Sequence, residues 1–136
     1  MDAEEQRRRF SAARVARLAT VRDDGRPHLV PVCFALDGDS IVSAVDAKPK
    51  RSTALQRLDN VRAHPDVSLL VDHYDDDWAR LWWVRVDGPA RVVDGGAEHA
   101  TAVARLASKY AQYRDAPPTG AVVAIEVRHW RGWSAT

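Results

Sequence analysis

Three cations of this 136-residue chain stand where a predicted strand runs into a predicted helix. Lys48, Lys50 and Arg51 directly precede the helix predicted over residues 53–63, and they include two of the chain's three lysines. The N-terminal end of a helix carries a partial positive charge and favours acidic side chains. Its free N–H groups bind phosphate readily, and Ser52 adds a hydroxyl donor beside them. The spacing predicts a local anion site, with a solvated charged loop as the alternative.

The tryptophans form a second group whose placement points to a ligand or a partner. Trp78, Trp82 and Trp83 lie close together in the sequence, and two more tryptophans stand near its end. Adjacent residues of a strand face opposite sides of a sheet, so Trp82 and Trp83 are expected on opposite faces. One of them can line the core. The other needs cover, which a partner subunit or a flat ligand would provide.

Residues that commonly hold metals or act as nucleophiles form no recognisable motif in this sequence. The five histidines, at positions 28, 64, 73, 99 and 129, share no ligand spacing. The acidic run at 75–77 lacks the Gly and Glu of a calcium loop. Cys33 lies in an apolar, alternating segment, so we expect a buried and unreactive thiol. We therefore predict no metal site, and no catalytic residue is identified.

Hydrophobic periodicity and turn residues predict the elements that position these groups. The predicted strands are 15–21, 28–36, 41–46, 67–74, 80–86 continued by 90–93, and 121–129; the predicted helices are 2–16, 53–63 and 97–113. Short turns between most neighbouring strands imply antiparallel pairing, because parallel pairs need long crossovers. The expected fold is mainly β: an antiparallel barrel of six or seven strands with a few peripheral helices.

Composition limits the classes of function. The length fits a single domain spanning residues 1–136, and the net charge of +1 argues against nucleic-acid binding. We find neither a signal peptide nor an apolar run of transmembrane length, so no membrane partner is expected. One cysteine excludes an internal disulfide and fits a reducing cytoplasm.

An ordered series of motifs carries a family resemblance. "LATVRDDGRPHLVPV" is followed by a strand that leads into "KPKR", and then by "HPDVSLLVD" and "WARLWWVRVDGPARVV". Together these resemble the split-barrel family of flavin and deazaflavin oxidoreductases. The chain is most similar to its pyridoxamine-phosphate-oxidase-like, coenzyme F420-dependent actinobacterial branch, and the resemblance covers residues 14–130. It implies a six-stranded antiparallel split β-barrel.

The resemblance also implies a homodimer that binds its cofactor in a groove between the subunits. The cofactor phosphate would be held by Lys50 and Arg51, which follow the third strand, with additional contacts from Lys48 and Ser52. The flavin-like ring would lie over Pro31, Val32, Ser43, Ala44 and Val45, against Trp78, Arg80 and Trp82 of the opposing subunit.

The implied activity is hydride transfer between F420 and a small organic substrate. The chain lacks the extended N-terminal segment and the C-terminal substrate motif of the pyridoxamine phosphate oxidases, so we do not expect pyridoxal phosphate synthesis. F420 is favoured over FMN because its oligoglutamate tail could pair with Arg51, Arg57 and Arg80. The alternatives are an FMN-dependent oxidase or reductase, and a non-catalytic carrier of F420, flavin or haem. Tyr74, His73 or water could donate the accompanying proton.

Overall fold

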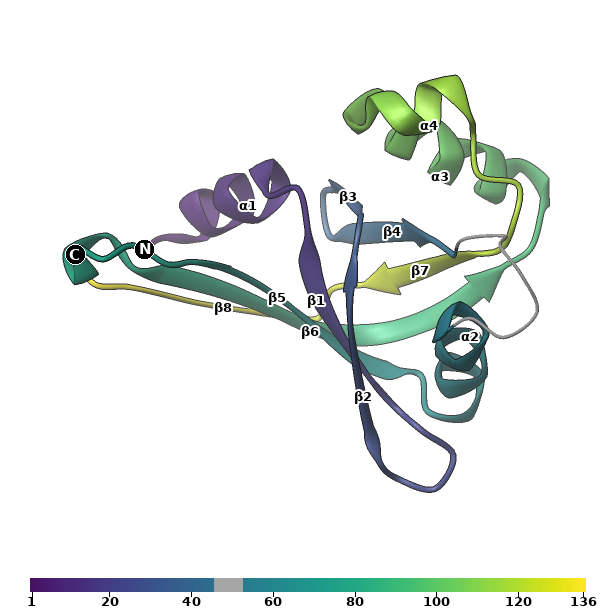
Figure 1. Cartoon of the computed structure of the whole chain (residues 1–136), viewed down its shortest axis with the longest axis horizontal. Helices are drawn as coiled ribbons and strands as arrows, with labels where there is room; N and C mark the ends of the chain where they lie inside the picture. The colour runs from purple at the N-terminus through teal and green to yellow at the C-terminus, as the bar shows by residue number, and fades with distance from the viewer. Residues whose placement is uncertain (46–52) are drawn as a thin grey trace.

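The computed structural model of the chain describes residues 1–45 and 53–136. Its strands are β1 (Ala16–Val21), β2 (Pro27–Val32), β3 (Ala35–Asp37), β4 (Ser40–Ala44), β5 (Asp66–His73), β6 (Trp82–Val93), β7 (Val122–Glu126) and β8 (His129–Ser134). Its helices are α1 (Ala3–Ala12), α2 (Thr53–Ala63), α3 (Gly96–Lys109) and α4 (Ala111–Asp115), with a 3-10 turn, η1, at Trp78–Arg80. Figure 1 shows the helices set around a strongly curved sheet.

The strands pair antiparallel in the order β2-β1-β5-β6-β7-β4-β3, and β8 pairs with β6. Strand β6 belongs to two parts of this sheet. Its residues 82–87 pair with β8 and, on the other side, with β5, whereas its residues 90–93 pair with β7. The long, bent β6 in Figure 1 therefore joins the two halves of the barrel. The fold is mainly β and antiparallel, as the sequence predicts.

The described residues form eight strands instead of the predicted six, because one predicted strand is divided into two and one strand was not predicted. Residues 28–36, expected as one strand, form β2 and β3, which pair with β1 and β4 respectively. The chain turns from one half of the barrel to the other at this point, and the buried ring of Phe34 occupies the corner. Residues 129–134 form β8, which the sequence analysis missed. None of its side chains is buried, so it carries no apolar core pattern.

Tyr110 ends the helix predicted over 97–113 earlier than expected. Its extended backbone (φ −117°, ψ 123°) separates α3 from α4. The Tyr110 hydroxyl donates to the Arg14 carbonyl oxygen at 2.8 Å and accepts from the Phe34 N–H at 3.1 Å. These long-range bonds favour the break, because they anchor the side chain beneath the β2–β3 corner. None of the helices in residues 1–45 and 53–136 is long and apolar enough to cross a membrane.

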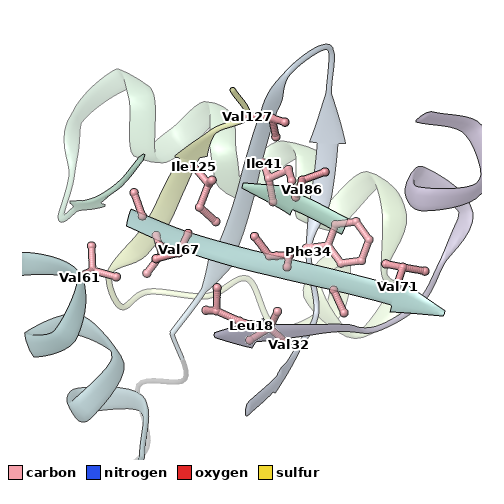
Figure 2. Close-up of a cluster of buried hydrophobic side chains, with 14 of the residues drawn as sticks. Leu18, Val32, Phe34, Ile41, Val61, Val67, Val71, Val86, Ile125 and Val127 are labelled. Atoms are coloured by element: carbon pink, nitrogen blue, oxygen red, sulfur yellow. The ribbon is translucent and has the colours of Figure 1, made fainter. Parts of the chain in front are cut away.

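The interior of the barrel is filled by one apolar cluster with members from α1, α2 and both halves of the sheet (Figure 2). The rings of Phe10 and Phe34 contact each other with centroids 5.0 Å apart. A second cluster, including Leu106 and Val122, packs α3 against the opposite face of β4 and β7. Both faces of β4 and β7 are thus covered, which explains why these strands are continuously apolar instead of alternating.

The bend in β6 depends on a close backbone approach at Gly88. A Cβ atom at this position would lie 1.9 Å from the carbonyl oxygen of Glu126. Beyond the bend the ladder changes partner, from β8 to β7. Only glycine leaves room for the two strands to cross so closely.

We expect Gly88→Ala to lower the free energy of unfolding by about 3 kcal/mol, because the added methyl group forces the crossing strands apart. Urea denaturation followed by circular dichroism measures this change. Gly95→Ala is the matched control, since a Cβ there meets nothing within 4 Å. That control should cost about 1 kcal/mol or less. Equal destabilisation by the two substitutions would contradict the crowding at Gly88.

Candidate functional site

The predicted phosphate-binding residues Lys48, Lys50, Arg51 and Ser52 lie outside the described residues. The structure does describe what precedes and follows them. The N–H of Val45 donates to the Ala121 carbonyl oxygen at 2.9 Å, which attaches the end of β4 to β7. Helix α2 then begins at Thr53, as the sequence predicts. The assignment of these four residues to a phosphate stays a prediction.

Arg57, in the second turn of α2, is a buried cation. Only 8% of its surface is exposed, whereas a flexible cofactor tail would be paired most readily by exposed cations. Among the residues that the structure describes, the Arg57 Nε atom is buried without a hydrogen-bond partner. Burial lowers the pKa of its guanidinium group, and the nearby Tyr113 opposes that effect. A buried donor without an acceptor is costly, which makes this position a candidate site for an anion.

His28 of β2 lies close enough to Arg57 to respond to its charge. It is also only 8% exposed, and its Nδ1 atom has no hydrogen-bond partner. The pKa of His28 is lowered, first by burial and then by the positive charges of Arg22 and Arg57. Two buried side chains, close enough for the charge of one to affect the other, therefore present nitrogen atoms without partners among the described residues. Such positive surroundings favour binding of an anion.

A hydrogen-bond chain fixes α2 beside these two side chains. Gln56 Nε2 donates to Asn60 Oδ1 at 2.7 Å, and Asn60 Nδ2 donates to Thr20 Oγ1 at 3.0 Å. Asn60 is completely buried, and Thr20 pairs across the β1–β2 ladder with His28. The helix that carries Arg57 is thus attached to β1, which pairs with the strand that carries His28.

Sequence reasoning offered Arg57, with Arg51 and Arg80, as a cation that could pair with the cofactor tail. Its position relative to the apolar residues of the helix could have indicated that Arg57 is buried. Arg57 lies four residues before Val61, which is 2% exposed, and residues four apart share a helical face. A charged residue on the apolar face of a helix is a candidate for a specific role.

The structure does not place the predicted ring-binding residues on one face. Ser43, Ala44 and Val45 are all buried at the end of β4 and just after it. Val32 and Val45 belong to the cluster inside the barrel, whereas Ala44 belongs to the cluster beneath α3. Pro31 is exposed on the side of β2 that faces away from Val32. Within one chain, only Val32 and Val45 of these five residues share an apolar cluster.

The predicted residues of the opposing subunit lie far from α2 in the same chain. Trp78 and Arg80 belong to η1, where Trp78 is 68% exposed and Arg80 forms a 3.8 Å ion pair with Asp77. Trp82 opens β6 and stacks on His73 with ring centroids 6.1 Å apart. Figure 1 shows the start of β6 and helix α2 on opposite sides of the molecule. A single chain does not bring these residues to the anion site.

The outer face of the sheet is a large, partly apolar surface. We use "outer face" for the side chains of β1, β2, β5, β6 and β8 that point away from the core, including Ala19, Leu29, Pro31, Leu70, Trp83, Arg85 and Trp133. Leu29 is 67% exposed and Trp133 is 45% exposed. Trp83 pairs across the ladder with Trp133, and Trp82 packs on the core, so the two adjacent tryptophans do face opposite sides. Exposed apolar surface of this kind marks an interaction site.

Cys33 is exposed at the corner between β2 and β3, which corrects the expectation of a buried thiol. The chain must leave one half of the barrel here, so its side chain points outward although the segment is apolar. Below the corner, Lys109 lies 3.8 Å from the centroid of the Phe34 ring, and burial lowers its pKa to about 8. In the described ranges, no group of three or more His, Cys, Asp or Glu side chains could hold a metal ion.

Comparison with known proteins agrees with this architecture. The family model for pyridoxamine 5'-phosphate oxidase matches residues 3–134. A conserved hypothetical protein of Mycobacterium tuberculosis superposes with a TM-score of 0.81 at 24% identity, over 99% of this chain and 86% of that one. An FAD-binding protein of Mesorhizobium loti superposes with a TM-score of 0.75 at 23% identity, over 97% and 94% of the two chains.

The haem storage protein HutZ of Vibrio cholerae has the same fold, with a TM-score of 0.75 at 14% identity over 97% of this chain and 93% of that one. No curated protein matches the chain. At these identities the solved structures establish the split-barrel fold of this chain. They do not show which ligand it binds.

Proposed function

The chain belongs to the pyridoxamine 5'-phosphate oxidase family, and we propose that it is an oxidoreductase that uses coenzyme F420 to transfer a hydride to or from a small organic substrate. The observation that carries this proposal is the buried cation Arg57 of α2, whose Nε atom has no hydrogen-bond partner among the described residues. A cofactor phosphate is the anion that it would hold.

The residues present fit such a phosphate. Helical side chains tilt toward the N-terminal end of their helix, so Arg57 is directed toward the start of α2. The free N–H groups of that helix end and its partial positive charge favour the same anion. We propose that Lys50 and Arg51 complete the site from the preceding segment, with Lys48 and Ser52 as helpers. His28 adds a further buried nitrogen, which donates a hydrogen bond when protonated.

The ring of the cofactor would extend from this phosphate along the end of β4. Ser43, Ala44 and Val45 precede the proposed phosphate-binding segment in the sequence, and Val32, at the end of β2, shares the core cluster of Val45. When bound, the deazaflavin would supply the hydride chemistry. The chain itself would anchor the phosphate, orient the ring and keep water away from one of its faces.

We propose that the site is completed by a second copy of the chain. Trp78, Arg80 and Trp82 lie too far from Arg57 to serve the same cofactor within one subunit, which fits a groove between two subunits. The outer face, with exposed Leu29 and Trp133, offers the apolar surface through which two copies would pack. The same packing would place Pro31 in the interface.

F420 is preferred to FMN on the basis of the cations of the chain. Its oligoglutamate tail carries several carboxylates, and the chain contains 20 Lys and Arg residues, most of them arginine. Proteins of this fold whose names state that they bind FAD or haem support a flat, conjugated ligand in general. An FMN-dependent enzyme and a carrier of F420, flavin or haem are therefore the alternative outcomes of the test.

Titration of the purified protein with F420, FMN and haem separates these functions. We expect F420 to bind with a micromolar dissociation constant, about −8 kcal/mol, and more tightly than FMN. F420 and FMN fluorescence and the absorbance of haem report the three complexes. Tighter binding of FMN would favour the FMN-dependent alternative, and tighter binding of haem would favour a haem carrier. Failure of all three to bind would contradict the proposed phosphate site.

A further inference from the structure

A cleft of about 430 Å³ lies between α1 and the sheet, away from Arg57. Figure 1 shows α1 beside the start of β1 and above the part of the sheet formed by β5, β6 and β8. The cleft has residues of α1 on one side and the ends of β1, β5 and β6 on the other. Its charged and aromatic lining consists of Arg8, Arg9, Arg14, Arg17, Asp72, His73 and Trp82.

The charge of this lining is strongly one-sided. Four arginines and one carboxylate, Asp72, line the cleft, although the whole chain has a net charge of only +1. A second carboxylate, Glu5, pairs with Arg8 and Arg9. Cations still exceed carboxylates here, and an anion in the cleft would balance that excess.

Arg9 is held in position by two neighbours. Its Nη2 atom lies 2.7 Å from Glu5 Oε1, and its guanidinium carbon lies 5.1 Å from the centroid of the Trp82 ring. Trp82 is in turn stacked on His73. The Arg9 side chain is only 28% exposed. A guanidinium fixed in this way loses little entropy when it binds an anion.

The other three arginines of the lining, Arg8, Arg14 and Arg17, form a longer ion pair than Arg9 does, or none among the described residues, and could still bind an anion. Arg14 donates to the Lys109 carbonyl oxygen at 3.1 Å and lies over the Tyr110 ring, and within residues 1–45 and 53–136 it forms no ion pair. Arg8 shares Glu5 with Arg9 at a longer distance of 3.6 Å, and its side chain is 71% exposed. Arg17 forms no ion pair with the residues that the structure describes.

We propose that this cleft binds a small molecule carrying two or more carboxylate groups. The guanidinium fork matches a carboxylate bidentately, and the arginines approach from two sides, Arg8 and Arg9 from α1 and Arg17 from β1. One acidic group could therefore not satisfy both sides. Carboxylate binding in the cleft does not depend on a bound cofactor. Identifying the bound carboxylate as the substrate does rest on the proposed oxidoreductase function.

Citrate is a suitable probe, because it carries three carboxylates and no aromatic ring. We expect citrate to bind the cofactor-free protein with a submillimolar dissociation constant and to change the fluorescence of Trp82, which lines the cleft. The double variant Arg8→Gln, Arg17→Gln should bind citrate about tenfold more weakly, as expected for two partly screened charge pairs. Arg26→Gln is the control, since Arg26 is 79% exposed in the β1–β2 turn.

Calorimetry at low and high salt tests the proposal. Affinity for citrate should fall as salt rises, because the pairs are exposed to screening. Equal citrate affinity in the double variant and the wild type would overturn the proposal, and so would a dissociation constant above about 10 mM. Trp82→Phe should abolish the fluorescence change, which rules out a signal from a remote tryptophan.

Loading the protein with a cofactor identifies the source of the carboxylates. Citrate binding that persists on the protein loaded with F420 indicates a free polycarboxylate substrate. Competition between citrate and long-tailed F420, but not FMN, indicates that the cofactor tail occupies the cleft. Either result supports the cleft as a carboxylate site. If neither cofactor binds while citrate does, the proposed function fails and the cleft proposal stands.

Discussion

Replacing Arg57 by methionine is expected to weaken cofactor binding at least tenfold and to stabilise the cofactor-free protein. The loss of affinity follows from removal of a charge-assisted hydrogen bond to the phosphate, worth about 1.5 to 3 kcal/mol. The gain in stability follows because Arg57 is 8% exposed and its Nε atom has no partner. An apolar side chain of similar length avoids the cost of burying that charge, and about 1 kcal/mol of stabilisation is expected.

Isothermal calorimetry with F420 or FMN measures the affinity, and urea denaturation of the cofactor-free protein measures the stability. Arg62→Met is the matched control on the same helix. The Arg62 side chain is 54% exposed and forms a 3.8 Å ion pair with Asp59, so neither quantity should change by more than about 0.5 kcal/mol. Destabilisation of the Arg57→Met protein by about 3 kcal/mol or more would instead show that Arg57 pairs with a carboxylate of the chain.

His28 provides an independent reporter of the same site. Its pKa is lowered in the cofactor-free protein by burial and by the charges of Arg22 and Arg57. A bound phosphate would favour the imidazolium form, and the pKa of His28 should therefore rise on binding. The unfolded protein binds a proton at this residue more readily than the folded one, so His28 adds stability above its unfolded pKa. That contribution is lost as the pH falls through the lowered folded pKa.

The β-rich pattern was readable from the sequence because most strands alternate between core and solvent. Leu18 and Thr20 of β1 are buried, whereas Arg17 is exposed, and this alternation specifies both the strand and its orientation. The start of α2 was also predictable, since Pro49 and polar residues precede an apolar repeat in the sequence. These features depend on neighbouring residues only.

The features that sequence reasoning missed depend on contacts between distant segments. Tyr110 breaks the predicted helix because its hydroxyl binds backbone groups of Arg14 and Phe34, which are far away in the sequence. Strand β8 forms because β6 offers a free edge along residues 82–87, although β8 buries none of its own residues. The local sequence pattern does not reveal contacts with segments that are distant in the sequence.

The burial of each predicted cation determines whether it suits a fixed phosphate or a flexible chain of carboxylates. Arg57 and Arg80 were expected to serve the same tail, yet Arg57 is 8% exposed and the Arg80 side chain is 72% exposed. The arginines suited to a flexible polyanion are those of the cleft beneath α1, where Arg9 is held by Glu5 and Trp82. The chain thus has a buried cation suited to one fixed phosphate and a separate exposed cluster suited to carboxylates.

Leu29→Glu is expected to convert the protein from a dimer to a monomer and to abolish tight cofactor binding. Leu29 is 67% exposed on the outer face, so the substitution should change the stability of an isolated chain by less than about 0.5 kcal/mol. In a two-fold dimer built on this face, however, each copy would bury a carboxylate without a partner. The dimer dissociation constant should therefore rise about 100-fold or more, because such a charge costs several kcal/mol.

Sedimentation velocity measures the assembly: the wild type should have twice the chain mass of 15.1 kDa, and the variant should have that mass alone. Ala104→Glu serves as the control, because Ala104 is exposed on α3, away from the outer face. The control should remain dimeric and bind cofactor normally. A monomeric variant that still binds cofactor as tightly as the wild type would show that one subunit suffices. A Leu29→Glu variant that stays dimeric would place the interface on another surface, and the groove between subunits would then need residues other than Trp78, Arg80 and Trp82.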